Sequence, residues 1–154
     1  MFLLWGSVDG IKIAPNPQSH AARFAPLRDL GEWLTANTPP GRPIGVLAAG
    51  ATPYYTDRPC IDMLGLNDHH IARVVPPDPI GTRNAGHEKY DFDYVLSRDP
   101  EFVLMAFSDR ADPNNLLWVS EQRDPTLRTR WLAAYEHFTI KTPGAEWRVL
   151  RKRR

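Results

Sequence analysis

The chain has 154 residues, of which 42% are hydrophobic and 24% charged, the size and composition of one globular domain with a hydrophobic core. Its formal net charge of +1 provides no global field that would attract nucleic acid, so we expect no nucleic-acid partner. The single cysteine, Cys60, excludes an intrachain disulfide and a zinc site built from several thiolates. We expect neither a metal nor another cofactor.

The chain begins with five apolar residues, Met1 to Trp5, followed by an irregular polar segment. This run is too short for a membrane span, which needs about 20 apolar residues, or for the apolar region of a signal peptide. It fits the end of a preceding membrane helix, with Trp5 at the interface, or an ordinary first strand. We assign residues 1–19 as a linker or the end of a preceding membrane segment, and residues 20–154 as a single α/β domain.

The first half of the domain opens with a helix, because apolar residues recur every three or four positions from 21 to 37. A Pro-Pro-Gly sequence at 39–41 ends it. The elements predicted next are a buried strand at 43–49, a polar and aromatic turn at 51–57, a strand at 59–63, a helix capped by Asn67 or Asp68 that runs to Arg73, and a loop at 75–83.

The second half continues the alternation. Its predicted elements are a helix at 88–97 closed by Asp99-Pro100, a strand at 101–107, a surface loop at 109–122, a helix from Asp124-Pro125 to about 137, and a hairpin of strands 138–141 and 146–150. Pro143 and Gly144 suit the central positions of a type II turn between those strands. The predicted fold class is therefore α/β, with a small, mostly parallel sheet flanked by helices and a C-terminal antiparallel hairpin at its edge.

Chemically active side chains are concentrated in residues 50–73. Because the loops that leave the carboxyl ends of strands line the ligand crevice of an α/β sheet, we expect five of these residues to share one edge: Tyr54, Tyr55, Asp62, Asn67 and Asp68. Tyrosines with carboxylates and an amide suit sugar binding, since rings stack on pyranoses and acids bond hydroxyls. The alternative is that the tyrosines pack a turn and Asp62 caps it or pairs with an arginine.

A second group, His87, Glu88 and Lys89, lies at a predicted helix start. The helix dipole favours Glu88 in the first turn, and His87 is available to face the crevice as a hydrogen-bonding or acid-base group. We therefore include all three among the ligand-binding or docking residues. The Asp68-His69-His70 run matches the Asp-His-His signature of metal-dependent phosphoesterases, but a polar helix start explains it as well.

Several short motifs occur in an order that resembles a known family. They are Pro53-Tyr54-Tyr55, Arg58-Pro59, IDMLGLND at 61–68, Ile71-Ala72, GHEK at 86–89 and Tyr94-Val95-Leu96. Over roughly residues 24–107 the chain resembles the soluble carboxy-terminal region of bacterial multi-spanning glycosyltransferases that use polyprenyl-phosphate sugars, such as arabinofuranosyl- and mannosyltransferase-like proteins. The resemblance implies a domain at the extracytoplasmic face of the membrane, with the membrane-embedded enzyme portion or the membrane surface as partner and an acceptor glycan as candidate ligand.

The resemblance also implies that these residues are not catalytic alone. In such enzymes the catalytic aspartate follows the first membrane helix, so we name no catalytic residue here. Two alternatives stay open: a stand-alone metal-dependent hydrolase using Asp62, Asp68, His69, His70 and His87, and a purely structural docking module. The basic C-terminal residues, from Arg148 to Arg154, are expected to form a solvated tail or to contact headgroups.

Overall fold

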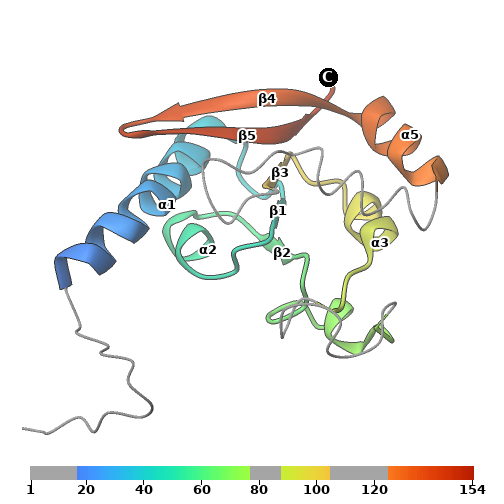
Figure 1. The fold of residues 1–154 in the computed structure, drawn as a ribbon. Helices are drawn as coiled ribbons and strands as arrows, with labels where there is room; N and C mark the ends of the chain where they lie inside the picture. Colours follow the sequence, from blue (N-terminus) through green and yellow to red (C-terminus); the bar gives the residue numbers. More distant parts are fainter. Residues whose placement is uncertain (1–16, 77–87, 105–124) are drawn as a thin grey trace, which may run out of the picture.

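A computed structural model describes residues 17–76, 88–104 and 125–154 (Figure 1). The predicted loop at 109–122, most of the predicted loop at 75–83, His87 and most of the predicted linker at 1–19 lie outside these residues. The described elements are α1 (Pro17–Asn37), β1 (Ile44–Val46), α2 (Ala51–Tyr55), β2 (Cys60–Asp62), η1 (Ile71–Arg73), α3 (Phe92–Ser97), β3 (Phe102–Leu104), α5 (Pro125–Ala134), β4 (Tyr135–Thr142) and β5 (Ala145–Lys152).

The strands form one mixed sheet in the order β2-β1-β3-β5-β4. The central strand β1 is parallel to β2 and β3, with Ile44 opposite Cys60 on one side and Phe102 on the other. The strand β5 is antiparallel to both β3 and β4. In Figure 1 the β4–β5 hairpin crosses the top of the molecule as its longest strand pair, above the three short parallel strands.

The prediction of a mostly parallel sheet is therefore wrong. Two of the described strand pairings are parallel and two are antiparallel. The parallel strands have three residues each, whereas each hairpin strand has eight. The hairpin itself was predicted correctly, and Gly144 has the φ of +83° that a type II turn requires at this position. However, β5 is an interior strand beside β3, and β4 alone forms that edge of the sheet.

Helices cover both faces of the sheet, which explains why β1 and β3 are buried throughout. Leu30 and Leu34 of α1 pack on one face, against a cluster that includes Ile44, Phe102 and Trp147. On the opposite face, α3 and α5 pack against the strands through residues that include Phe92, Val95, Leu127 and Trp131. The helix α2 packs against α1.

Several local predictions differ from the structure in length or type. Residues 51–57 were expected to form a turn, but five of them form α2, whose packing on α1 stabilises a helix too short to persist alone. The helix predicted from residue 88 begins instead at Phe92, where the side chain of Asp91 accepts a hydrogen bond from Tyr94 N. The last helix ends at Ala134, because Tyr135 already pairs with Lys152 in the hairpin.

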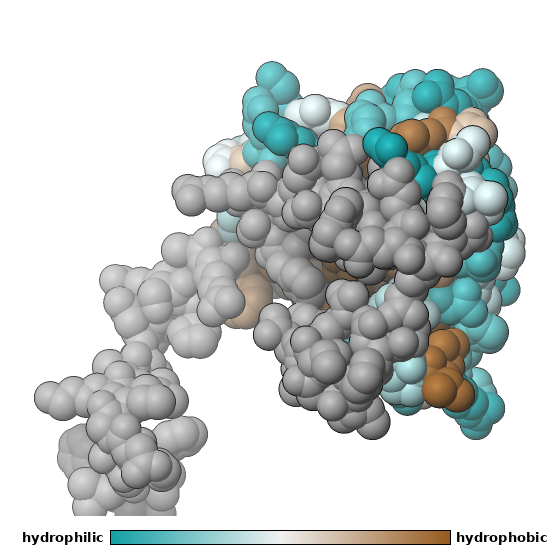
Figure 2. Space-filling view, turned by 45° about the vertical axis from the view of Figure 1, so that its right-hand side comes forward, coloured by the Kyte–Doolittle hydropathy of each residue, from teal (hydrophilic) through white to brown (hydrophobic). Residues whose placement is uncertain are grey.

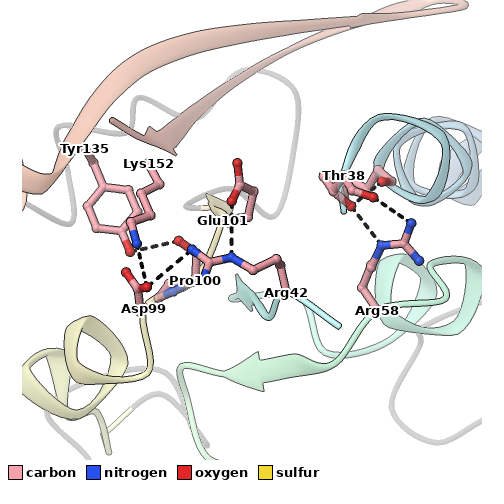
Figure 3. A network of polar contacts seen from close by, with 9 residues as sticks. Thr38, Arg42, Arg58, Asp99, Pro100, Glu101, Tyr135 and Lys152 are labelled. Atoms are coloured by element: carbon pink, nitrogen blue, oxygen red, sulfur yellow. Dashed lines mark hydrogen bonds and ion pairs between the residues drawn. The ribbon is translucent and has the colours of Figure 1, made fainter. Parts of the chain in front are cut away.

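Two polar networks hold the elements together at their ends (Figure 3). Arg58 donates to Thr35 O at 2.6 Å and to Thr38 O at 2.7 Å, so its cation caps the carboxyl end of α1. In the second network, Asp99 accepts hydrogen bonds from Arg42 and Lys152. That network joins residues next to β1, β3 and β5 at one end of the sheet, and Tyr135 adds a buried hydrogen bond to Pro100 O at 2.9 Å.

The C-terminal residues also differ from the expected solvated tail. The strand β5 extends to Lys152. Arg151 pairs with Glu136 and lies over the ring of Phe138, at 4.0 Å from its centroid. Arg153 donates to Tyr135 O at 3.0 Å. The side chains of Arg151 and Arg153 therefore stabilise the hairpin and its junction with α5.

Candidate functional site

Asp62, at the end of β2, organises the loop that follows it. Its side chain is buried, with 3% of its surface exposed. One carboxylate oxygen accepts a hydrogen bond from Leu64 N at 3.0 Å, and the other accepts one from Asn67 N at 2.7 Å. Both oxygens thus satisfy backbone donors, which is the capping role named above as the alternative to ligand binding.

The loop after β2 is closed by two further devices. Gly65 has a φ of +76°, and an added Cβ would lie 2.8 Å from Ala72 N, so only glycine allows the chain to fold back here. Asn67 is itself exposed, and its side-chain amide donates to Ala49 O at 3.4 Å, which joins this loop to the end of the β1 segment.

Asp68, one of the two cap candidates that the sequence offered, caps the next turn. One of its oxygens accepts hydrogen bonds from His70 N and Ile71 N, both at 3.0 Å. The turn continues as the 3-10 helix η1, which is shorter than the helix predicted over 67–73. The other oxygen of Asp68 accepts a hydrogen bond from the hydroxyl of Tyr94 at 3.3 Å, and this contact links the loop to α3.

Asp91 and Tyr94, which the sequence reasoning did not select, complete this cluster. Asp91 lies 2.9 Å from Nε2 of His70, and the ring of Tyr94 stacks on the His70 imidazole with centroids 4.0 Å apart. Burial, followed by the negative charge of Asp68, raises the pKa of Tyr94, so its hydroxyl remains a donor. One sequence signal could have identified these residues: Asp91 suits an N-cap, and Tyr94 lies three positions after it, where the capped backbone amide is expected.

Glu88 and Lys89 lie beside a cavity of about 380 Å³, which we call the loop pocket. Its other lining residues belong to the loop after β2 and to the η1 region: Leu64, Gly65, Leu66, Ala72 and Pro76. The ammonium group of Lys89 donates to Ala72 O and thereby crosses from the segment before α3 to η1. The structure thus brings together Asp62, Asn67, Asp68, Glu88 and Lys89 in one region, at the carboxyl end of β2.

Tyr54 and Tyr55 belong to a different surface, formed by α2 and α1. Tyr55 packs against α1, where a Cβ added to Gly31 would lie 2.8 Å from the Cβ of Tyr55. The ring of Tyr54 meets that of Tyr55 edge to face at a centroid distance of 5.0 Å. The contacts of Tyr55 are thus with α1, and Tyr54 contacts Tyr55. The single edge expected for all the selected residues stays a prediction.

Among the residues that the structure describes, no group of three or more His, Cys, Asp or Glu side chains is placed to hold a metal ion. His69 is exposed, and His70 pairs with Asp91. The predicted contribution of His87 lies outside the described residues. None of the helices in the described part of the chain is both long and apolar enough to cross a membrane.

Fold and site together define a small mixed α/β domain whose loop carboxylates support a pocket at the carboxyl end of the parallel strands. The chain belongs to the family described as "Domain of unknown function (DUF8728)", whose model matches residues 13–152. A comparison with curated proteins found no match. A comparison with solved structures also found none. The resemblance to glycosyltransferase C-terminal regions stays a prediction.

Proposed function

We propose that this chain is an accessory domain of a membrane glycosyltransferase, which binds acceptor glycan at the extracytoplasmic face of a bacterial membrane and is not catalytic alone. The motif order described above motivates the enzyme class. The observation that carries the glycan contact is the tyrosine pair on α2. Tyr54 is 81% exposed, which leaves its ring face available for a pyranose or furanose ring.

Contacts with α1 hold α2, the helix that carries the tyrosine pair. The hydroxyl of Thr52 in α2 bonds Leu27 O of α1 at 3.5 Å, and Asp57 N donates to the hydroxyl of Thr35 at 3.1 Å. The absence of a side chain at Gly31 lets the two helices approach closely. These contacts fix α2 on α1, so the backbone beneath the two rings needs little ordering when a sugar binds, which favours recognition.

The helix α1, against which Tyr55 packs, also carries charged groups. Arg28 is half exposed, bonds Asp29 at 2.8 Å and lies 3.8 Å from Glu32. An exposed tyrosine pair on a helix pair that also carries carboxylates and a guanidinium offers both the stacking face and the hydrogen-bonding groups that a sugar needs.

The contacts of the loop carboxylates give no support to a catalytic role for them. General acid-base catalysis requires a carboxylate that can reach the reacting group. Both oxygens of Asp62 accept backbone N–H groups, and Asp68 accepts from two backbone amides and a tyrosine hydroxyl. These side chains therefore build loops in the described structure.

The test is a titration of the 15N-labelled chain with arabinan and mannan oligosaccharides, followed by amide chemical shifts. We expect saturable shifts in residues 50–57. Tyr54→Ala should weaken binding by about 5-fold or more, since an aromatic contact contributes about 1 kcal/mol, whereas Tyr54→Phe should bind like the wild type. The matched control is Val75→Ala, which removes an exposed apolar side chain from another loop.

Two results would contradict the glycan assignment. One is the absence of shifts in residues 50–57 with either oligosaccharide. The other is wild-type affinity in Tyr54→Ala. If the shifts were absent, the tyrosine surface would remain only as a candidate for docking on the membrane-embedded portion of the enzyme, and the acceptor-binding role would be withdrawn.

A further inference from the structure

Lys89 carries a partly buried positive charge beside the loop pocket. Its ammonium group donates to the carbonyl of Ala72, which is a neutral acceptor. Within the described residues, no carboxylate lies at ion-pair distance from this group, although Glu88 also lines the pocket. An ammonium group has three donors, so a cation placed in this way can still bind an anion that enters the cavity.

Most of the described residues that line the loop pocket are apolar. Leu64, Leu66, Ala72 and Pro76 supply hydrocarbon surface. The loop that carries Leu64 and Leu66 is held by the buried Asp62 carboxylate through Leu64 N and Asn67 N. This wall of the cavity is therefore fixed before a ligand binds, which reduces the entropic cost of binding.

Hydrophobic surface continues outside the pocket. Leu66, which lines the pocket, is 68% exposed, and Val75, the neighbour of Pro76, is 83% exposed. Figure 2 shows hydrophobic groups reaching the surface in separate places, including the lower end of the molecule, where Figure 1 draws the loop after β2. Apolar side chains exposed next to a cavity are typical of a binding site that accepts an apolar group.

We propose that the loop pocket binds a small amphipathic anion, with its apolar body against Leu64, Leu66 and Pro76 and its anionic group on Lys89. The cavity of about 380 Å³ is near the lower end of the range for small-molecule sites, so the ligand is compact. A single carboxylate on a short hydrocarbon chain satisfies these conditions.

This site is separate from the Tyr54–Tyr55 surface, and it does not depend on the proposed function. Asp62, Asp68 and Gly65 acquire a specific role in this proposal. They shape the loop that forms the pocket wall, whereas Lys89 and the apolar side chains contact the ligand.

The experiment compares three probes of matched shape on the full 15N-labelled chain at pH 7: hexanoate, 1-hexanol and hexylammonium. Hexanoate should produce saturable shifts at the amides of Gly65, Leu66, Ala72 and Lys89. Hexanol should bind roughly 10- to 100-fold more weakly, which corresponds to the loss of one charge-assisted hydrogen bond, and hexylammonium should bind more weakly still. Equal affinities for the three probes, or the absence of saturable shifts at these amides, would overturn the proposal.

Variants then test the role of the cation. Lys89→Met should abolish the preference for hexanoate over hexanol, and Lys89→Arg should retain it. Arg73→Met, which removes an exposed cation from η1, is the control and should also retain it. Because Lys89→Met also removes the bond to Ala72 O, the wild-type probe series and Lys89→Arg decide the outcome if this variant is misfolded. Retention of the preference in a folded Lys89→Met chain would refute the assignment.

Discussion

Replacement of Asp62 provides the sharpest test of how the loop after β2 is built. Its carboxylate is 3% exposed and accepts hydrogen bonds from Leu64 N at 3.0 Å and Asn67 N at 2.7 Å. Asp62→Ala removes both acceptors, and Asp62→Asn keeps one carbonyl oxygen but sets its NH2 group against the other donor. The alanine variant should therefore be the less stable of the two.

The magnitude follows from the two lost acceptors. A hydrogen bond to a charged group contributes about 1.5–3 kcal/mol, but the loop is near the surface and its amides can recover part of this by contacting water. We expect Asp62→Ala to lower the free energy of unfolding by about 3 kcal/mol, and Asp62→Asn by about half as much. For a chain of this size, the alanine variant should melt roughly 6–12 °C below the wild type.

The assay is urea and thermal unfolding followed by circular dichroism. The control is Asp57→Ala, because Asp57 is exposed and makes its contacts through backbone atoms; it should stay within about 0.5 kcal/mol of the wild type. If Asp62→Ala also stayed within that limit, the buried carboxylate would not stabilise the loop, and the account of the pocket wall would be refuted.

Three further predictions concern other parts of the molecule. Gly31→Val should lower the free energy of unfolding by about 1–3 kcal/mol, because a Cβ there lies 2.8 Å from that of Tyr55, and an unchanged urea midpoint would contradict the close helix contact. The ammonium of Lys152 is the main cause of a lowered pKa at Asp99, so the carboxylate stabilises the fold above its unfolded pKa of about 3.9 and loses this effect as the pH falls through its folded pKa. Asp99→Asn should therefore cost at most about 1 kcal/mol at pH 6, since the pair is partly exposed, and a loss that persisted at pH 2 would exclude the charge as its cause. Burial raises the pKa of Cys60 to about 11, so a thiol reagent at pH 7.5 should react far more slowly with the native chain than with the urea-unfolded one; equal rates would contradict the burial.

Several elements could be predicted because their signals are local. The apolar period over 21–37 identified most of α1, and the Pro-Pro-Gly sequence identified its end. The pair Pro143-Gly144 identified the hairpin turn. The cap at Asp68 was also predictable, since a carboxylate one turn before a helix accepts the free backbone amides whatever the rest of the chain does.

Strand pairing was not predictable in this way. Both hairpin strands follow α5, and either could lie beside β3; a parallel neighbour at that position would have made the sheet mostly parallel. In the structure β5 lies beside β3 and runs antiparallel to it, with Val103 opposite Leu150. The sheet is therefore mixed, in the order β2-β1-β3-β5-β4. The choice depends on contacts between residues far apart in the chain, which periodicity does not report.

The candidate site shows the same difference between features that depend on local sequence and features that depend on long-range contacts. The sequence by itself determined the hairpin turn at Pro143-Gly144 and offered Asp68 as a cap, but it placed the start of α3 too early and did not select Asp91. Only the tertiary structure decided that Asp62 is buried under its own loop, that Lys89 reaches Ala72 and that Tyr55 packs against α1. The physical reason is that capping and turn formation involve neighbours in sequence, whereas burial and charge pairing depend on which distant segments pack together.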